Sequence, residues 1–108
     1  VFTLHAGSTE QHYAAQIDAA CGGGWSVERL HETGERIWNL ERQFNLAAGL
    51  SAADDTLPKR ILSEPAPSGA AKGLVCKLPD MLPKYYALRG WSADGVPEPA
   101  TLSRLGLG

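Results

Sequence analysis

The apolar residues of this chain recur every three or four positions in several segments, which is the period of an amphipathic α-helix. The first segment begins at Ser8, a plausible N-cap that Gln11 follows at the spacing of a capping box. Its apolar face comprises Ala14, Ile17 and either Ala20 or Cys21. Three glycines at 22–24 end it, because glycine adopts the left-handed conformations that favour a helix exit. We therefore expect the first helix over residues 8–21.

The second helical pattern is the longest, with Ser26 as the expected N-cap and Gly49 just beyond its end near Ala48. Trp38 widens an apolar stripe with 3-4-3-4 spacing, which comprises Leu30, Thr33, Ile37, Leu40 and Phe44. Gly34 costs about 1 kcal/mol relative to alanine in mid-helix, so we expect another backbone to approach closely there. The stretch "GERIWNLERQFN" at 34–45 is therefore either the core helix of a free-standing domain or a packing surface of a larger protein.

The rest of the chain predicts shorter elements. Residues 50–78 contain Pro58, Pro65 and Pro67, and we expect an extended loop with a turn of helix at 57–62. A third helix is expected at 80–89, with Pro83 tolerated in its first turn and Gly90 closing it. Its predicted apolar side comprises Met81, Leu82, Tyr85 and Leu88. A last helix is expected at 99–105. No strand is convincing, although residues 73–77 can pair briefly.

This pattern predicts an all-α fold, an irregular bundle of about four helices with a long Pro/Gly-rich loop and no internal domain boundary. The chain has 108 residues, 44% apolar and 20% charged, as is typical of one soluble globular domain. Its net charge is only −2, so we expect no nucleic-acid partner. No window holds the roughly 18 apolar residues of a membrane span, and no signal peptide is visible, so we expect a cytoplasmic protein with no membrane partner.

The first residues do not resemble an ordinary N-terminus. The chain begins with Val1 and enters apolar sequence at once, with Phe2 and Leu4. Natural termini are more often polar and frayed. We therefore expect a piece of a longer polypeptide, with exposed apolar surface around residues 1–4 that upstream sequence would cover.

Candidate chemistry is sparse. The histidines, which we interpret as surface or capping groups because none follows a metal-binding pattern, are His5, His12 and His31. Cys21 and Cys76 form no CxxC pair, so we expect buried free thiols. The charged stretch "DDTLPKR" at 54–60 is either a docking or cofactor-supporting loop, or a loop whose acids cap a helical turn and whose bases pair with them. The second interpretation is favoured, and we expect no catalytic, cofactor-binding or metal-ligating residue in this chain.

Three long segments nevertheless resemble one family, in its order, over about 14–107. They are "GWSVERLHETGERIWNLERQFN", "DDTLPKRILSEPAPSGAAKG" and "DMLPKYYALRGWSADGVPEPATLSRLGL". Each is similar to the last helical domain of the aldehyde ferredoxin oxidoreductases. The resemblance implies that residues 1–108 are the C-terminal portion of that domain in a much longer enzyme.

The resemblance also implies the parent's chemistry. Enzymes of this family oxidise aldehydes to carboxylic acids and pass the electrons to ferredoxin or another redox partner. Tungsten, or molybdenum in some relatives, is held by two pterin dithiolenes beside a [4Fe–4S] cluster. An N-terminal β domain supports the pterins, and two helical domains lie over them. The remainder of the parent polypeptide, ferredoxin and the aldehyde are thus the implied partners.

The family's cofactor motif in its last domain, Asp-x-x-Gly-Leu-Cys, is absent from this sequence. The register would place it immediately before Val1, and neither Cys21 nor Cys76 matches a cluster-ligand position. We therefore expect this chain alone to bind no tungsten, pterin or iron–sulfur cluster and to be inactive. The helix prolines Pro79 and Pro83 and the glycine-rich "ACGGGW" depart from the family pattern. The alternative is a free-standing, non-catalytic helical scaffold or interaction domain of the same descent.

Overall fold

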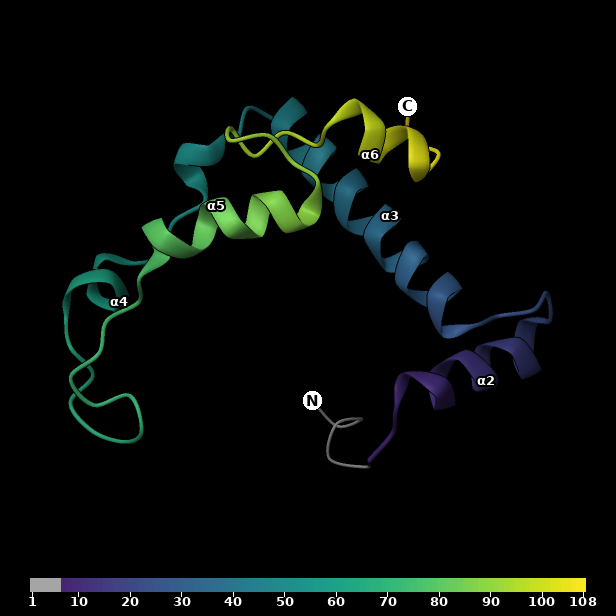
Figure 1. Cartoon of the computed structure of the whole chain (residues 1–108), viewed down its shortest axis with the longest axis horizontal. Coiled ribbons are helices and arrows are strands. Elements are labelled where there is room, and N and C mark those ends of the chain that lie inside the picture. The colour runs from purple at the N-terminus through teal and green to yellow at the C-terminus, as the bar shows by residue number, and fades with distance from the viewer. Residues whose placement is uncertain (1–6) are drawn as a thin grey trace. The chain divides into compact units, whose positions relative to one another are not determined.

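The computed structural model describes residues 7–108 of the chain and is mostly helical there (Figure 1). His5 and the apolar patch expected at 1–4 lie outside the described residues. The helices are α2 (Glu10–Cys21), α3 (Val27–Ala47), the 3-10 turn η1 (Ala52–Asp54), α4 (Lys59–Ser63), α5 (Leu78–Arg89) and α6 (Pro99–Arg104). Over residues 7–108 there are thus five α-helices, against about four expected, and no strand. The described part of the chain contains no helix long and apolar enough to cross a membrane.

The chain divides into two compact units, which meet within α3 between Trp38 and Asn39. In the first unit, the N-cap of α2 lies one residue later than expected, at Thr9 and not at Ser8. His12, at the third helical position, accepts a hydrogen bond from the Thr9 N–H at 2.9 Å, the role expected of Gln11. The glycines end α2 as predicted, since its C-cap residue at position 22 has φ +65°.

α3 has the predicted ends. The side chain of Ser26 accepts a hydrogen bond from the Arg29 N–H at 3.2 Å, and Gly49 follows the helix with φ +94°. The expectation for Gly34 is not met within the described chain, because a Cβ placed there would meet nothing within 4 Å. Glycine at this position therefore has no packing reason among residues 7–108.

The second unit contains α4, α5 and α6. α5 begins at Leu78, so Pro79 occupies its first turn while Pro83 lies inside the helix, contrary to the expected first-turn position. Pro83 has no N–H to donate to the carbonyl of Pro79, so α5 lacks one hydrogen bond of its first turn. Gly90 ends α5 in the left-handed conformation, as predicted.

The predicted apolar side of α5 is correct only in part, because Leu82 and Tyr85 are half-buried but the other two residues are not. Met81 and Leu88 are exposed, by 56% and 85% respectively, whereas Tyr86 is the buried residue of the helix. The core of this unit instead collects Tyr86, Trp91 and Leu105, the last of which is completely buried. The helical period located the helix but not its buried face. Tyr86 is buried with a polar partner, Asp55, which lies 31 residues away in sequence and leaves no trace in the period.

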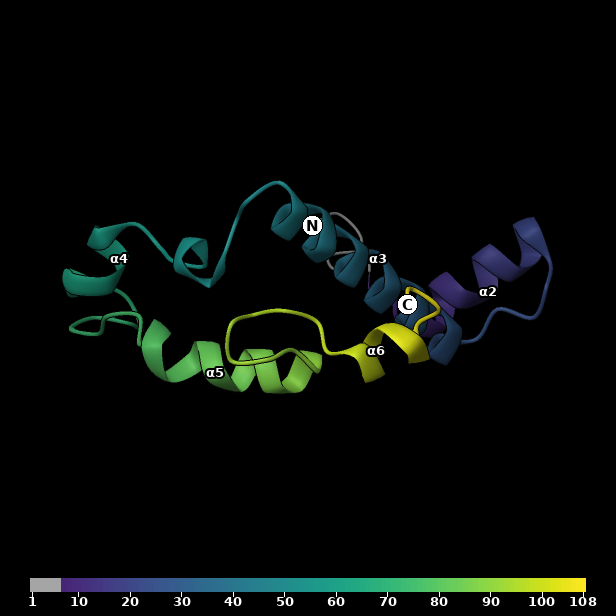
Figure 2. The same cartoon turned by 90° about the horizontal axis from the view of Figure 1, so that it is seen from above.

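The segment at 50–78 is organised by local hydrogen bonds. The N–H of Ala66 donates to the carbonyl of Leu74, and the N–H of Cys76 donates to the carbonyl of Ile61, each at 3.0 Å. These bonds supply the brief pairing expected at 73–77 without forming a strand. α4 occupies most of the stretch where a helical turn was expected. Figures 1 and 2 both place α4 and α6 at opposite ends of this unit.

Candidate functional site

Arg42 of α3 is the centre of a set of buried hydrogen bonds in the second unit. Its two terminal nitrogens donate to the two carboxylate oxygens of Asp55, at 2.8 and 2.6 Å. Its Nε donates to the carbonyl oxygen of Gly95 at 2.8 Å. Arg42 is only 8% exposed, and the side chain of Asp55 is 26% exposed. One guanidinium therefore joins α3 to the residue after η1 and to the turn after α5.

Three further side chains complete this arrangement. The Tyr86 hydroxyl donates to an oxygen of Asp55, and the Trp91 indole N–H donates to the Asn39 side-chain oxygen at 2.8 Å. The Arg42 guanidinium lies 5.0 Å from the centre of the Trp91 ring, within range of a cation–π contact. We call these five residues the Arg42 cluster: Asn39, Arg42, Asp55, Tyr86 and Trp91. No buried side-chain nitrogen or oxygen in the described chain lacks a hydrogen-bond partner.

The turn after α5 fits this cluster because of Gly95. Its φ of +68° is a conformation that L side chains rarely adopt. A Cβ there would lie 2.9 Å from the Tyr86 ring and would also collide with Arg42. The turn is closed by a hydrogen bond from the Ser92 N–H to the Val96 carbonyl at 2.8 Å. Glycine is thus the residue that lets this backbone carbonyl reach the guanidinium.

The electrostatics of the cluster favour its ionised pair. The hydrogen bond to Asp55 raises the pKa of Arg42 further above its ordinary value. Burial alone would raise the pKa of Asp55, but the hydrogen bonds from Arg42 and Tyr86 outweigh burial and hold it below its ordinary value. Burial, with the hydrogen bond to Asp55, raises the pKa of Tyr86 to about 12. At neutral pH the cluster therefore holds a carboxylate, a guanidinium and a neutral phenol.

This arrangement is suited to holding backbone segments together and not to proton transfer. Both oxygens of Asp55 already accept hydrogen bonds from Arg42, and Tyr86 is far too weak an acid to give up its proton near neutral pH. A general acid or base needs a pKa near the working pH and access to a substrate proton. The Arg42 cluster meets neither requirement.

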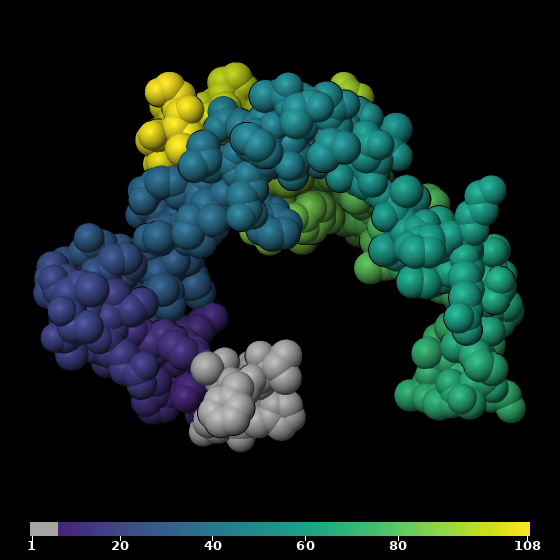
Figure 3. Space-filling view, turned by 180° about the vertical axis from the view of Figure 1, so that it is seen from behind, coloured from purple at the N-terminus to yellow at the C-terminus, as the bar shows by residue number. Residues whose placement is uncertain are grey.

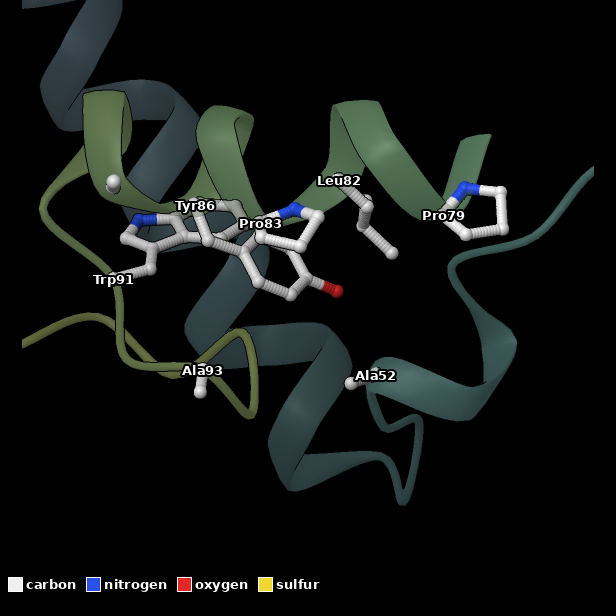
Figure 4. Close-up of a pocket in the computed structure, with 8 residues that line it drawn as sticks. Ala52, Pro79, Leu82, Pro83, Tyr86, Trp91 and Ala93 are labelled. Carbon is white, nitrogen blue, oxygen red and sulfur yellow. The ribbon is translucent and has the colours of Figure 1, made fainter. Parts of the chain in front are cut away.

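An apolar hollow of about 390 Å³ lies beside the cluster (Figure 4). It is lined by Ala52, Pro79, Leu82, Pro83, Tyr86, Ala87, Trp91 and Ala93. Figure 4 shows the Tyr86 and Trp91 rings side by side along one wall. Its lining offers apolar surface and two aromatic rings, with no metal-ligating side chain among them.

The remaining sequence candidates lie apart from the cluster. His12 caps α2, and His31 lies 3.0 Å from Glu10 on exposed surface, so both have the surface or capping roles that were expected. Cys21 is exposed, so the expectation of a buried thiol is wrong there, whereas Cys76 is half-buried, and both thiols are free. Within residues 7–108 no three His, Cys, Asp or Glu side chains gather as a metal site would require.

The charged stretch at 54–60 is divided between two roles. Asp54 accepts a hydrogen bond from the Ser51 N–H at 2.8 Å and completes the cap of η1, as the favoured interpretation predicted. The expected pairing of its bases with its acids is wrong: Arg60 lies 3.5 Å from Glu64, and Asp55 pairs with Arg42. Asp55 pairs with the buried guanidinium and not with a nearby base, because a bidentate partner supplies two charge-assisted hydrogen bonds at once.

The face of α3 that is buried in this chain is not the predicted apolar stripe. Asn39 is 1% exposed, whereas Ile37, Leu40 and Phe44 are 54%, 55% and 73% exposed. Of the two interpretations of residues 34–45, the core helix of a free-standing domain does not fit these exposed side chains, whereas a packing surface of a larger protein does. Sequence reasoning missed the cluster because Asn39 and Arg42 resemble the solvated side of an amphipathic helix. Their spacing of three residues on one face is the only local signal that could have grouped them.

Comparison with known proteins places these features in a wider context. Residues 1–107 match the family described as "Aldehyde ferredoxin oxidoreductase, domains 2 & 3". The chain is 54% identical over 97 residues to a protein of Pyrococcus abyssi named "Tungsten-containing aldehyde ferredoxin oxidoreductase", a match that covers 88% of this chain and 16% of the relative. A protein of the same name from Thermococcus kodakarensis is 56% identical over 84 residues, which cover 77% of this chain and 14% of the relative. The chain thus spans only about a sixth of these relatives.

A solved structure shares the fold. It is described as "Active site complex BamBC of Benzoyl Coenzyme A reductase in complex with 1,5 Dienoyl-CoA". It superposes with a TM-score of 0.73 at 31% sequence identity, over 94% of this chain and 14% of that one.

Proposed function

This chain belongs to the aldehyde ferredoxin oxidoreductase family, and we propose that it is a structural portion of a longer tungsten enzyme that oxidises aldehydes to carboxylic acids. Its relatives carry tungsten and ferredoxin in their names and are about six times longer. In this proposal the chain forms the C-terminal portion of the last helical domain. Alone it is inactive and binds neither tungsten, pterin nor an iron–sulfur cluster.

The observation that carries the proposal is the reversed amphipathicity of α3. Polar Asn39 and Arg42 are buried within the chain, while the side chains of Ile37, Leu40 and Phe44 are exposed by more than half. Their exposed fractions together amount to almost two whole side chains, so covering them would stabilise the protein by roughly 3–5 kcal/mol. A surface of this kind suits a helix that other parts of a larger protein cover.

The role of these residues in the parent is to hold backbone in place. When bound elsewhere in the parent, the tungsten pterin centre and the [4Fe–4S] cluster would supply aldehyde oxidation and electron transfer to ferredoxin. Residues 7–108 offer no donor set for either group, and we assign them no step in the reaction. The Arg42 cluster instead fixes α3, the residue after η1 and the turn after α5 to one another. Catalytic sites need such supporting contacts, because their geometry must hold to within about half an ångström.

A free-standing scaffold is the second candidate. The observation that favours it is the complete hydrogen bonding of the buried side chains in the described chain, which a self-sufficient domain requires. The substrate class of the parent does not follow from the fold. The fold is shared with a benzoyl-coenzyme A reductase, an enzyme that acts on a different substrate.

Both candidates are tested on the intact protein from its source cells. We expect stoichiometric tungsten and iron by elemental analysis, together with ferredoxin reduction that depends on an aldehyde. Benzoyl-coenzyme A in place of the aldehyde tests the other substrate class on the same sample. An intact polypeptide whose N-terminus lies near residue 1 and that contains neither metal would overturn the proposal. It would leave the free-standing scaffold as the function.

A further inference from the structure

α3 carries two faces that point in nearly opposite directions. Successive residues of an α-helix are rotated by about 100°, so Leu40 and Phe44 lie roughly 150° around the helix from Asn39 and Arg42. The face with Asn39 and Arg42 contacts the turn and loop residues of the second unit. The face with Leu40 and Phe44 is exposed. Figure 3 shows the C-terminal part of α3 with no other part of the chain in front of it.

The exposed face has the ridges and groove of a helix-packing surface. An open hollow of about 470 Å³ is lined by Leu40, Glu41, Phe44 and Asn45. These four residues form two neighbouring rows, Leu40 with Phe44 and Glu41 with Asn45, in which the members are four positions apart. The groove between two such rows is where a ridge of side chains from another helix inserts.

The sequence of the stripe favours a helix over other partners. The 3-4-3-4 spacing that ends in Ile37, Leu40 and Phe44 is the seam spacing of paired helices. A strand would instead present its side chains with a period of two residues and would not follow this seam. Glu41 borders the hollow on its polar side, so a basic residue beside the partner's ridge would complement it.

Resting on the proposed function, we infer that the Leu40–Phe44 groove binds a helix of the parent polypeptide that lies outside this chain, with an apolar ridge and an adjacent lysine or arginine. About five-sixths of the relatives' length lies outside the matched region, so the parent has ample chain to supply it. A second copy of this chain is a poorer occupant. Symmetric pairing of two copies across the groove would bring the two Glu41 carboxylates together.

The test is photo-cross-linking in the full-length protein. Phe44 is replaced by p-benzoylphenylalanine, an aromatic of similar shape, and the exposed Lys72 in the loop after α4 is replaced in a matched control. Irradiation at position 44 is expected to give an intramolecular cross-link to an upstream peptide with helical apolar spacing, and a much weaker or different product at position 72. Mass spectrometry of the digested protein identifies the linked peptides.

Other outcomes overturn the inference. A cross-link between two copies, seen as doubled mass on a denaturing gel, assigns the groove to self-association. A cross-link confined to residues 1–108, or none at all, shows that no upstream helix lies there. Tungsten content and aldehyde oxidation of the same preparation separate the two claims. If both are present without the cross-link, only the inference fails; if the polypeptide proves to be this chain alone, the proposed function and the inference fail together.

Discussion

Replacing Arg42 by methionine tests whether the Arg42 cluster holds the second unit together. Methionine keeps the unbranched stem but removes every donor, so Asp55 loses both hydrogen bonds from the guanidinium and the Gly95 carbonyl loses its partner. Removing one member of a buried ion pair costs about 3–5 kcal/mol, because the other charge remains buried without compensation. Asp55 is 26% exposed, so water can reach it in part. We therefore expect Arg42→Met to lower the free energy of unfolding by about 3 kcal/mol, at the lower end of that range.

That loss is large on the scale of this chain. A protein of 108 residues is typically stable by roughly 5–15 kcal/mol. With a urea m-value of about 1–3 kcal/mol per molar, the unfolding midpoint should fall by about 1–3 M. The assay is urea unfolding of the 108-residue chain, followed by tryptophan fluorescence, to which Trp91 of the cluster contributes.

The matched control is Arg60→Met. Arg60 pairs with Glu64 at 3.5 Å, but their side chains are 80% and 68% exposed, so this change should cost no more than about 0.5 kcal/mol. Adding Asp55→Asn to Arg42→Met should restore part of the lost stability, because the unpaired charge is then removed. Equal midpoints for Arg42→Met and Arg60→Met would refute the reasoning, since the buried pair would then contribute no more than an exposed one.

Three further predictions concern pH, the buried amide and the mid-helix glycine. The folded-state pKa of Asp55 is lowered, so its stabilisation is present above its unfolded value near 3.8 and should be lost as the pH falls through the folded value. The pKa of Tyr86 is raised from 10.0 to about 12, so its stabilisation is present below pH 10 and should be lost between pH 10 and 12. Unfolding midpoints measured across pH check both the acid and the alkaline loss of stability. Tyr86→Phe should abolish the alkaline loss. Asn39→Leu leaves the Trp91 indole N–H without its acceptor and should cost about 1–3 kcal/mol in urea unfolding, whereas a neutral effect would mean that water replaces the amide. Gly34→Ala should stabilise the 108-residue chain by up to about 1 kcal/mol, because nothing lies within 4 Å of the added methyl; thermal unfolding that shows destabilisation would indicate an unseen close contact.

The helix ends of this chain could be predicted because local residues decide them. Ser26 and Gly90 act through their own side chain or their own φ, so the sequence contains the whole cause. The cap of α2 was misplaced by one residue for a related reason. His12 competes with a neighbouring glutamine for the same role, and the difference between them is small.

The buried face of each helix could not be predicted, because partners distant in sequence decide it. Arg42 is buried only because Asp55, thirteen residues away, and Gly95, 53 residues away, meet it in space. Periodicity correctly identified an apolar stripe on α3, but Ile37, Leu40 and Phe44 in it stay exposed within residues 7–108. The same limit applies to Tyr86, whose burial depends on the carboxylate of Asp55.

The size of the native polypeptide tests the central claim most directly. An antibody raised against this chain should capture the protein from its source cells, and mass spectrometry should give its intact mass. We predict a mass several times the 11.5 kDa of this chain, with the sequence matched here near one end. A captured polypeptide of about 11.5 kDa would contradict the account, because the apolar face of α3 would then need another explanation.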